Sequence, residues 1–305
     1  MACPLCNEKR FVNIKGYNCK ELIRQYKTAF SVDVSAYFNE LDNLSLYQCV
    51  NCYLKYFPDG KEGNADFYEI LSKEPWYYQK EKFEYDSALN KIVEYKPKSI
   101  LDVGCGEGFF LEHFKDSFEV RGSEYNPDAI KALESKGIRL DDDSMKYDFI
   151  VCFQVIEHIK NVHDFLDWIY SKLNNGGYLF IAVPNPDSEF IKEVPQLLNF
   201  PPHHINWISK STLYKVSELY NMEIVDYMEE PMEDIHLIPF LNTRKKMVST
   251  SISSNSFLAK MKQAIFLMSR AFIGEGIQVS LYPFIKDYMK YRGHTHGILL
   301  KKCNR

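Results

Sequence analysis

Residues 101–110, "LDVGCGEGFF", place a glycine at every second position from Gly104 to Gly108, directly behind a short apolar run. The apolar residues at 99–103 predict a buried strand that turns into a helix at these glycines. Glycine at such a turn lets the backbone approach a ligand closely. A dinucleotide fingerprint, G-x-G-x-x-G, would need glycine where Phe109 stands. The spacing therefore favours a ligand without a pyrophosphate.

Two acidic residues flank this turn. Asp102 precedes the first glycine, where a carboxylate suits a ligand that carries an ammonium group. Glu124 closes the next predicted strand, 118–124, where a carboxylate can accept both hydroxyls of a ribose. The two acids together indicate a nucleoside ligand with a charged amino group.

From about residue 98 onward, predicted strands and helices alternate, as they do in a parallel sheet covered by helices. A proline-rich loop at 184–209 is long enough to indicate a lid or binding loop. We expect the other strands at 147–153, 178–183, 223–229 and 296–302, and helices at 107–116, 127–136 and 159–173.

Four stretches in this order resemble the motifs of class I S-adenosylmethionine-dependent methyltransferases. They are "LDVGCGEG" (101–108), "GSEYNPDAI" (122–130), "YDFIVCFQVIEHIKN" (147–161) and "LNNGGYLFIAVPN" (173–185). The resemblance covers about 98–185. It implies an α/β fold with a Rossmann-like, doubly wound, seven-stranded and mostly parallel sheet, and an enzyme that transfers a methyl group from S-adenosylmethionine.

The resemblance also implies roles for individual residues. The backbone around Gly104 and Gly106 would cradle the methionine part of the cofactor, with Asp102 towards its ammonium group. Glu124 would hold the ribose, and Tyr125 would lie against the adenine.

Two further cofactor contacts follow from the same resemblance. Asp142 or Asp143 would lie near the adenine amino group, and the run of three aspartates leaves the choice between them open. Gln154, just past the strand at 147–153, would face the methionine part.

The cysteines Cys3, Cys6, Cys49 and Cys52 form two C-x-x-C pairs, which suit a tetrahedral zinc site. Four protein ligands would make the zinc structural, and the residues between the pairs must fold back as strands or a hairpin. The region resembles the zinc-binding N-terminal part of some bacterial methyltransferases that modify sugars and other small metabolites. No glycine follows either pair, and four unligated thiols or a redox pair remain the alternatives.

Histidines are the candidates for deprotonating a methyl acceptor. His158 follows the strand at 147–153, and His203 and His204 lie in the proline-rich loop. A purely structural role in shaping that loop is the alternative. The aromatic residues Trp76, Tyr77 and Tyr78 are expected in a lid over the cofactor or in an ordinary packing face.

We divide the chain into a zinc-binding N-terminal region (1–60), a helical lid or linker (61–97), a cofactor-binding core (98–230) and a C-terminal helical insertion with the last strand of the core (231–305). The insertion contains an amphipathic stretch at 256–274. A core helix or lid, a dimer contact and a peripheral membrane contact all fit that pattern.

The net charge of −4 gives no global attraction to nucleic acid or to an anionic membrane, and we expect a cytoplasmic protein without a transmembrane segment. We expect O-methyl transfer to a small acceptor, a sugar or glycan precursor. A methyltransferase acting on RNA or protein, and a non-catalytic cofactor-binding or zinc-dependent interaction module, are the alternatives. The oligomeric state stays open.

Overall fold

The structure is a computed structural model that describes residues 2–38, 41–74, 77–142, 144–194, 196–232, 236, 239–240, 243 and 291–303. The chain divides into two compact units. The first comprises 1–186, 196–228 and 295–305, and the second comprises 187–195 and 229–294.

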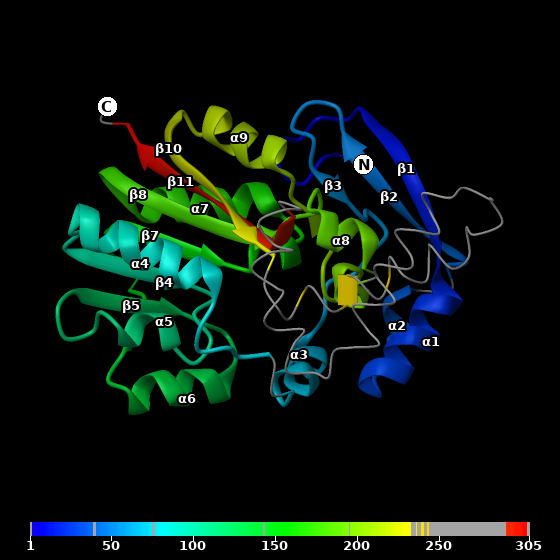
Figure 1. Cartoon of the computed structure of the whole chain (residues 1–305), viewed down its shortest axis with the longest axis horizontal. Coiled ribbons are helices and arrows are strands. Elements are labelled where there is room, and N and C mark those ends of the chain that lie inside the picture. Colours follow the sequence, from blue (N-terminus) through cyan, green and yellow to red (C-terminus); the bar gives the residue numbers. More distant parts are fainter. Residues whose placement is uncertain are drawn as a thin grey trace, which may run out of the picture. The chain divides into compact units, whose positions relative to one another are not determined.

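A seven-stranded sheet forms the centre of the larger unit, in the order β10-β11-β8-β7-β4-β5-β6 (Figure 1). Strands β4 to β8 pair in parallel, and β11 runs antiparallel to β8. The predicted seven-stranded, mostly parallel sheet is therefore confirmed. Its strands are β4 (Ser99–Val103), β5 (Glu119–Ser123), β6 (Arg139–Leu140), β7 (Tyr147–Phe153), β8 (Leu173–Pro184), β10 (Met222–Pro231) and β11 (Arg292–Lys302).

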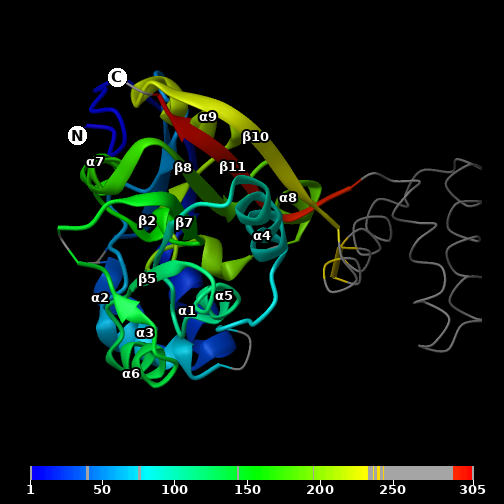
Figure 2. The same cartoon turned by 90° about the vertical axis from the view of Figure 1, so that its left-hand side faces the viewer.

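Both faces of this sheet carry apolar side chains, and helices cover each face (Figures 1 and 2). Along β4, Ile100 packs against one set of helices, while its neighbour Leu101 packs against the other. The first set is α4 (Phe83–Tyr95), α5 (Phe109–Glu112) and α6 (Pro127–Ser135), and the second is α7 (Val162–Lys172) and α9 (Lys210–Leu219).

A second sheet, in the order β1-β2-β3-β9, is built mainly from the N-terminal residues. The first two strands pair antiparallel, so the residues between the cysteine pairs fold back as strands, as predicted. The fourth strand comes from the proline-rich loop and pairs with β3. The elements of this region are β1 (Phe11–Asn18), α1 (Cys19–Phe30), α2 (Ser35–Phe38), β2 (Asn43–Cys49), β3 (Lys55–Tyr56), α3 (Ala65–Ser72) and β9 (Asn206–Trp207).

Three local predictions need correction. The helix expected at 107–116 is only α5, because backbone bonds from Phe114 to Leu111 and from Ser117 to Phe114 tighten the following residues into turns. The helix expected from 159 begins at Val162, after the 3₁₀ turn η1 (Ile156–His158). The loop expected at 184–209 holds α8 (Glu189–Glu193), η2 (Leu197–Asn199) and β9.

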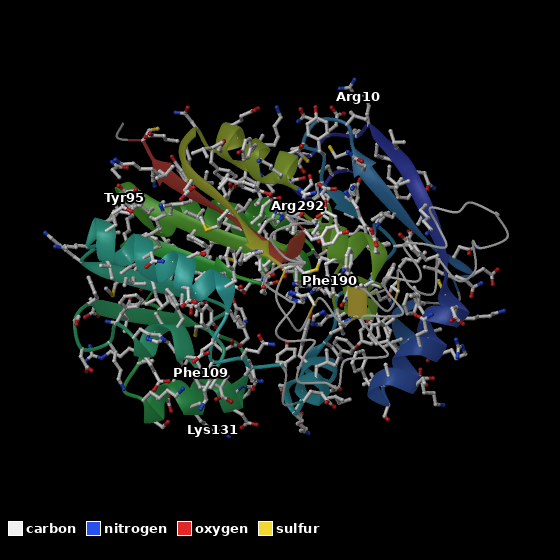
Figure 3. All side chains as sticks on the ribbon, in the orientation of Figure 1. Arg10, Tyr95, Phe109, Lys131, Phe190 and Arg292 are labelled. Carbon is white, nitrogen blue, oxygen red and sulfur yellow. The ribbon has the colours of Figure 1, made fainter. Side chains whose placement is uncertain are left out.

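The second unit is described only in part. Its Arg292 guanidinium contacts the carboxylates of Glu189 and Glu229, each at 3.1 Å. Phe190 packs with Met232 and Phe240, and Phe190 and Arg292 are labelled in Figure 3. The amphipathic stretch at 256–274 lies outside the described residues. Within the described part of the chain, every helix is too short or too polar to cross a membrane.

Candidate functional site

The glycine loop between β4 and α5 needs glycine for its backbone and for its neighbours. The φ angles of Gly104, Gly106 and Gly108 are +73°, +53° and +77°. A Cβ atom on Gly104 would lie 2.4 Å from Val155 Cγ2, and one on Gly106 would lie 2.8 Å from Tyr78 Cε1. The glycine loop therefore packs between Val155, which follows Gln154, and Tyr78 of the predicted lid.

Glu124 connects this loop to the next strand. Its carboxylate accepts hydrogen bonds from the backbone N–H groups of Gly106 (2.9 Å), Tyr125 (2.7 Å) and Asn126 (2.9 Å). The Asn126 side chain caps α6 and also donates to the Tyr78 hydroxyl at 3.2 Å. The predicted ribose carboxylate and the predicted lid thus meet at the glycine loop.

Asp102 lies on β4 with 2% of its surface exposed, on the face that α4 covers. Its Oδ1 atom is buried without a hydrogen-bond partner in the part of the chain that the structure describes. Burial raises the pKa of Asp102 to about 8. The ammonium group of a ligand would supply the missing partner and the opposite charge, so this residue fits the methionine part of S-adenosylmethionine.

The other predicted cofactor residues come directly after the carboxyl ends of neighbouring strands in the same sheet. Tyr125, directly after β5, is 93% exposed. Asp142, after β6, is exposed and accepts bonds from the Ser144 N–H (2.9 Å) and hydroxyl (2.6 Å). Gln154, after β7, has φ +56° and donates to the Glu84 carboxylate at 3.2 Å. Asp143 and Trp76 lie outside the described residues.

The three predicted histidines meet in space although they are far apart in sequence. His158 ends η1, His203 lies in the turn after η2 and His204 follows it, and one ring nitrogen of each lies within 4.8 Å of the others. Burial lowers the pKa of His158 to about 4, and burial together with His158 holds the pKa of His203 well below its usual value. These two imidazoles are therefore neutral at pH 7.

Each ring is anchored through its Nδ1 atom. His158 Nδ1 lies 2.6 Å from the carbonyl oxygen of His203, and His203 Nδ1 lies 3.1 Å from the carbonyl oxygen of Leu198. His204 Nδ1 lies 3.1 Å from Asn199 Oδ1. Carbonyl oxygens only accept hydrogen bonds, so the proton of a neutral ring with such a partner is on Nδ1 and the lone pair is on Nε2.

Both sheets hold the histidine loop in place. The Ile205 N–H donates to the Glu157 carbonyl at 3.0 Å, which ties the loop to η1 of the central sheet. The Phe57 N–H donates to the Ile205 carbonyl at 3.0 Å, next to the pairing of β3 with β9. The N-terminal sheet is therefore part of the framework that positions His203 and His204.

Comparison with known proteins agrees with this arrangement. Residues 77–227 match a family described as "Methyltransferase domain", and these residues include the glycine loop, Glu124 and all three histidines. The chain is an S-adenosylmethionine-dependent methyltransferase. The resemblance read from its four sequence motifs is confirmed.

Individual relatives of the methyltransferase are distant. A ubiquinone biosynthesis O-methyltransferase of Rickettsia bellii is 27% identical over 173 residues, which cover 45% of this chain and 69% of the relative. A Mycolicibacterium smegmatis protein named "Probable S-adenosylmethionine-dependent methyltransferase" is 24% identical, over 51% of this chain and 63% of its own. A methyltransferase structure from Archaeoglobus fulgidus has a TM-score of 0.48 at 21% identity, covering 77% of this chain and all of its own.

Glu157, which precedes His158, is a further candidate site residue that the sequence motifs did not indicate by themselves. Its side chain is 1% exposed, and both carboxyl oxygens are buried without a hydrogen-bond partner among the described residues. Burial raises the pKa of Glu157 to about 8. The pair Glu157–His158 in the third motif could have indicated it, because a carboxylate next to a candidate base at the end of a strand is itself a candidate site residue.

Two tyrosines from the segment before the core also border the histidines. The Tyr68 ring lies 5.8 Å from that of His158, and the Tyr77 ring lies 6.5 Å from that of His203, both edge-on. The Tyr68 hydroxyl lies 3.2 Å from His158 Nδ1. Both tyrosines also pack against the core of the N-terminal region, so the lid and the ordinary packing face stay the two readings of this segment.

The four predicted cysteine ligands lie together in the N-terminal region of the methyltransferase. The Sγ atoms of Cys3 and Cys52 are 3.4 Å apart, and those of Cys6 and Cys49 are 3.6 Å apart. Zinc bonded tetrahedrally to four sulfurs at about 2.3 Å requires sulfur separations of about 3.8 Å. The donor set and the spacing therefore fit a zinc ion with no open position.

A surface hollow lies at the other end of the strands. It is lined by residues 95–98, which lie before β4, by Asp148 near the start of β7, and by residues 175–178 in the first half of β8. The glycine loop and the histidines follow the carboxyl ends of β4, β7 and β8. The hollow is therefore separate from the glycine loop and from the histidine cluster.

Proposed function

We propose that the methyltransferase transfers the methyl group to a hydroxyl oxygen of a small organic acceptor held beside His158, His203 and His204. The observation that supports this proposal is the meeting of three imidazoles next to the cofactor loop. Val155 packs directly against Gly104 of the glycine loop, and it lies only three residues before His158 in the sequence. A methyl acceptor must lie in line with the sulfonium and must lose its proton, and this cluster is close enough to serve both needs.

The cofactor supplies an electrophilic methyl group on a positively charged sulfur. We assign its binding to the chain's own residues as predicted from the sequence: Asp102 to the ammonium group, the backbone of Gly104 and Gly106 to the methionine part, and Glu124 to the ribose. Tyr125, Asp142, Asp143 and Gln154 are the proposed contacts around these. Tyr78, which packs on Gly106, would help to exclude water from the cofactor.

The proton of the acceptor hydroxyl would leave at the histidine cluster. A neutral imidazole can accept a proton at neutral pH, and the anchored Nδ1 atoms orient the rings. The acceptor O–H bond breaks as the bond from oxygen to methyl forms, and the cofactor's S–CH₃ electron pair stays on sulfur. Burial makes the histidines weak bases on their own, which a further group at the cluster would have to offset.

The acceptor is proposed to be a phenol or a sugar. The Rickettsia relatives are named for O-methyl transfer in ubiquinone biosynthesis, while the N-terminal cysteine region resembles that of sugar-modifying enzymes. The rings of Tyr68 and Tyr77 offer apolar surfaces to either class.

We also propose that Cys3, Cys6, Cys49 and Cys52 hold a structural zinc ion. The ion would order β2 and β3, which in turn pair with β9 directly after the two histidines. The zinc would thus act on catalysis only through the position of the loop.

An acceptor panel tests the proposed function. The purified protein is incubated with S-adenosylmethionine and with phenols, nucleotide sugars, free sugars and amines, and S-adenosylhomocysteine and the methylated product are measured by mass spectrometry. We expect turnover with one hydroxyl-bearing class and a product that carries the methyl group on oxygen. Turnover confined to amines, or with none of the compounds, would contradict the proposal.

A further inference from the structure

We propose that His158, His203 and His204 bind a divalent transition-metal ion, and that the acceptor oxygen is a further ligand of this ion. The metal site stands on the geometry of the three rings alone. Its role in catalysis rests on the proposed hydroxyl acceptor.

The ring nitrogens are nearly close enough to share an ion. One nitrogen of each ring lies within 4.8 Å of the others. Tetrahedral zinc with nitrogen ligands at about 2.0–2.1 Å requires nitrogen separations of about 3.3 Å, so the rings must approach by at most about 1.5 Å. The His203 and His204 rings are stacked at 4.4 Å with an interplanar angle of 28°, so one of these two rings must turn before both lone pairs can point at the same ion.

The hydrogen bonds of the rings match those of metal-binding histidines. A ligating imidazole usually donates its second N–H to a carbonyl or carboxylate, which fixes the tautomer and the ring orientation. All three Nδ1 atoms lie 2.6–3.1 Å from a carbonyl oxygen, on His203, Leu198 and Asn199. Buried histidines are generally hydrogen-bonded, and it is the convergence of the three rings that points to an ion.

The surroundings can compensate the charge of a dication. Glu157 is the residue before His158, and its buried carboxyl oxygens have no hydrogen-bond partner among the described residues. A carboxyl group in such a place is costly in its charged form, and a nearby cation removes that cost. The metal would therefore explain both the three imidazoles and the buried acid.

Three protein ligands leave at least one position of the ion open. A hydroxyl group bound there becomes more acidic, so the proton can leave to water while the oxygen attacks the methyl group. In this arrangement the ion replaces a histidine as the means of removing the proton, because a ring nitrogen that binds the ion has no lone pair left to accept one. The cysteine cluster, with four ligands, offers no such position.

Metal analysis of two matched variants tests the site. We expect the purified protein, reconstituted with Zn²⁺, to hold two ions per chain by mass spectrometry of the metal, and H203Q to hold one. The control is H163Q, which changes a partly exposed histidine outside the cluster and should still hold two ions. Two ions in H203Q, or one in the unchanged protein while the cysteine cluster is loaded, would overturn the proposal.

Cobalt separates the two sites if H203Q folds poorly. Co²⁺ bound to cysteine gives an intense sulfur-to-metal absorption, whereas Co²⁺ bound to imidazole gives only weak visible bands. Titration of the metal-free full chain should produce both signals, and H158N, which substitutes no residue of the proline-rich loop, should lose the weak bands alone. A single sulfur-type spectrum from the unchanged protein would also overturn the proposal.

The readouts distinguish this inference from the proposed function. Metal bound by the histidines without turnover on any hydroxyl acceptor would leave the site intact and remove the function. Full O-methyl transfer by a protein that holds only the cysteine-bound ion would leave the function intact and remove the inference.

Discussion

The proposed cofactor side and the proposed acceptor side of this methyltransferase are encoded differently. Asp102, the glycine loop and Glu124 come from one stretch of about 25 residues, in which a strand, a turn and a second strand place them together. Tyr68, His158 and His203 come from three distant segments, and the last of these is held by a strand pairing with the N-terminal sheet. Cofactor binding should therefore tolerate changes in the N-terminal sheet that abolish turnover.

Loss of the cysteine cluster should separate the two sides most strongly. Replacing Cys52 with Ser removes one of four ligands, and structural zinc contributes on the order of 10 kcal/mol to folding in small zinc domains. We expect turnover to fall about 1,000-fold or more, while the Kd for S-adenosylmethionine in calorimetry changes by less than about fivefold, since the cofactor loop is outside that sheet. C303S, at an exposed cysteine, is the control. An equal loss of cofactor affinity would show that the sides are not separable.

D102N should produce the opposite pattern. Removing the charge partner of a buried ammonium group costs about 2–5 kcal/mol, so the cofactor should bind about 30-fold more weakly or worse. The stability of the ligand-free protein should not fall, because Asp102 Oδ1 has no hydrogen-bond partner among the described residues and is costly to charge when buried. The measurements are calorimetry and thermal unfolding, with D116N as the exposed control. Cofactor affinity within threefold of the unchanged protein would refute the assigned role.

G104A should disturb both sides, because this residue lies between them. Its Cβ would lie 2.4 Å from Val155 Cγ2, and a φ of +73° strains any other residue, so we expect a loss of about 1–3 kcal/mol in unfolding free energy. The control G16A meets no atom within 4 Å. Denaturant unfolding compares the two, and equal stability of both variants would contradict the packing described for the loop.

The pH dependence of cofactor binding should be the smallest of these effects. The pKa of Asp102 is raised to about 8 in the free protein, so binding of an ammonium group below that pH must release a proton. Affinity should rise by up to about tenfold per pH unit as the pH approaches 8 from below. The same raised pKa means that this group favours folding at low pH and that its contribution is lost as pH rises through about 8. Calorimetry in buffers of different ionisation enthalpy measures the proton, and D102N should release none.

The sequence predicted the central sheet because each strand is an apolar run between clear helix caps and turns, as with Asn126 and Pro127 before α6. The strand β9 was missed because its two residues, Asn206 and Trp207, have no pattern of their own and form a strand only by pairing with β3. Tertiary context, which local sequence does not carry, decides such a pairing.

The candidate site shows the same limit. The sequence proposed all three histidines, yet nothing local indicated that they meet, since about 45 residues separate His158 from His203. Glu157 was missed because the burial of a side chain on a short 3₁₀ turn depends on what packs over that turn. Here it is the proline-rich loop, in which the Ile205 N–H donates to the Glu157 carbonyl oxygen. The cofactor residues needed no such information, because their positions follow from the strand and turn that contain them.

The central claim is that the histidine cluster acts on the acceptor and not on the cofactor. The direct measurement is a pair of constants for H204Q: the Kd for S-adenosylmethionine and the turnover with the acceptor found in the panel, beside H163Q as control. We predict a Kd within about threefold of the unchanged protein and a turnover lowered about 100-fold or more, the scale of lost proton transfer. Turnover at the level of the control, or a loss of cofactor affinity as large as in D102N, would contradict the account.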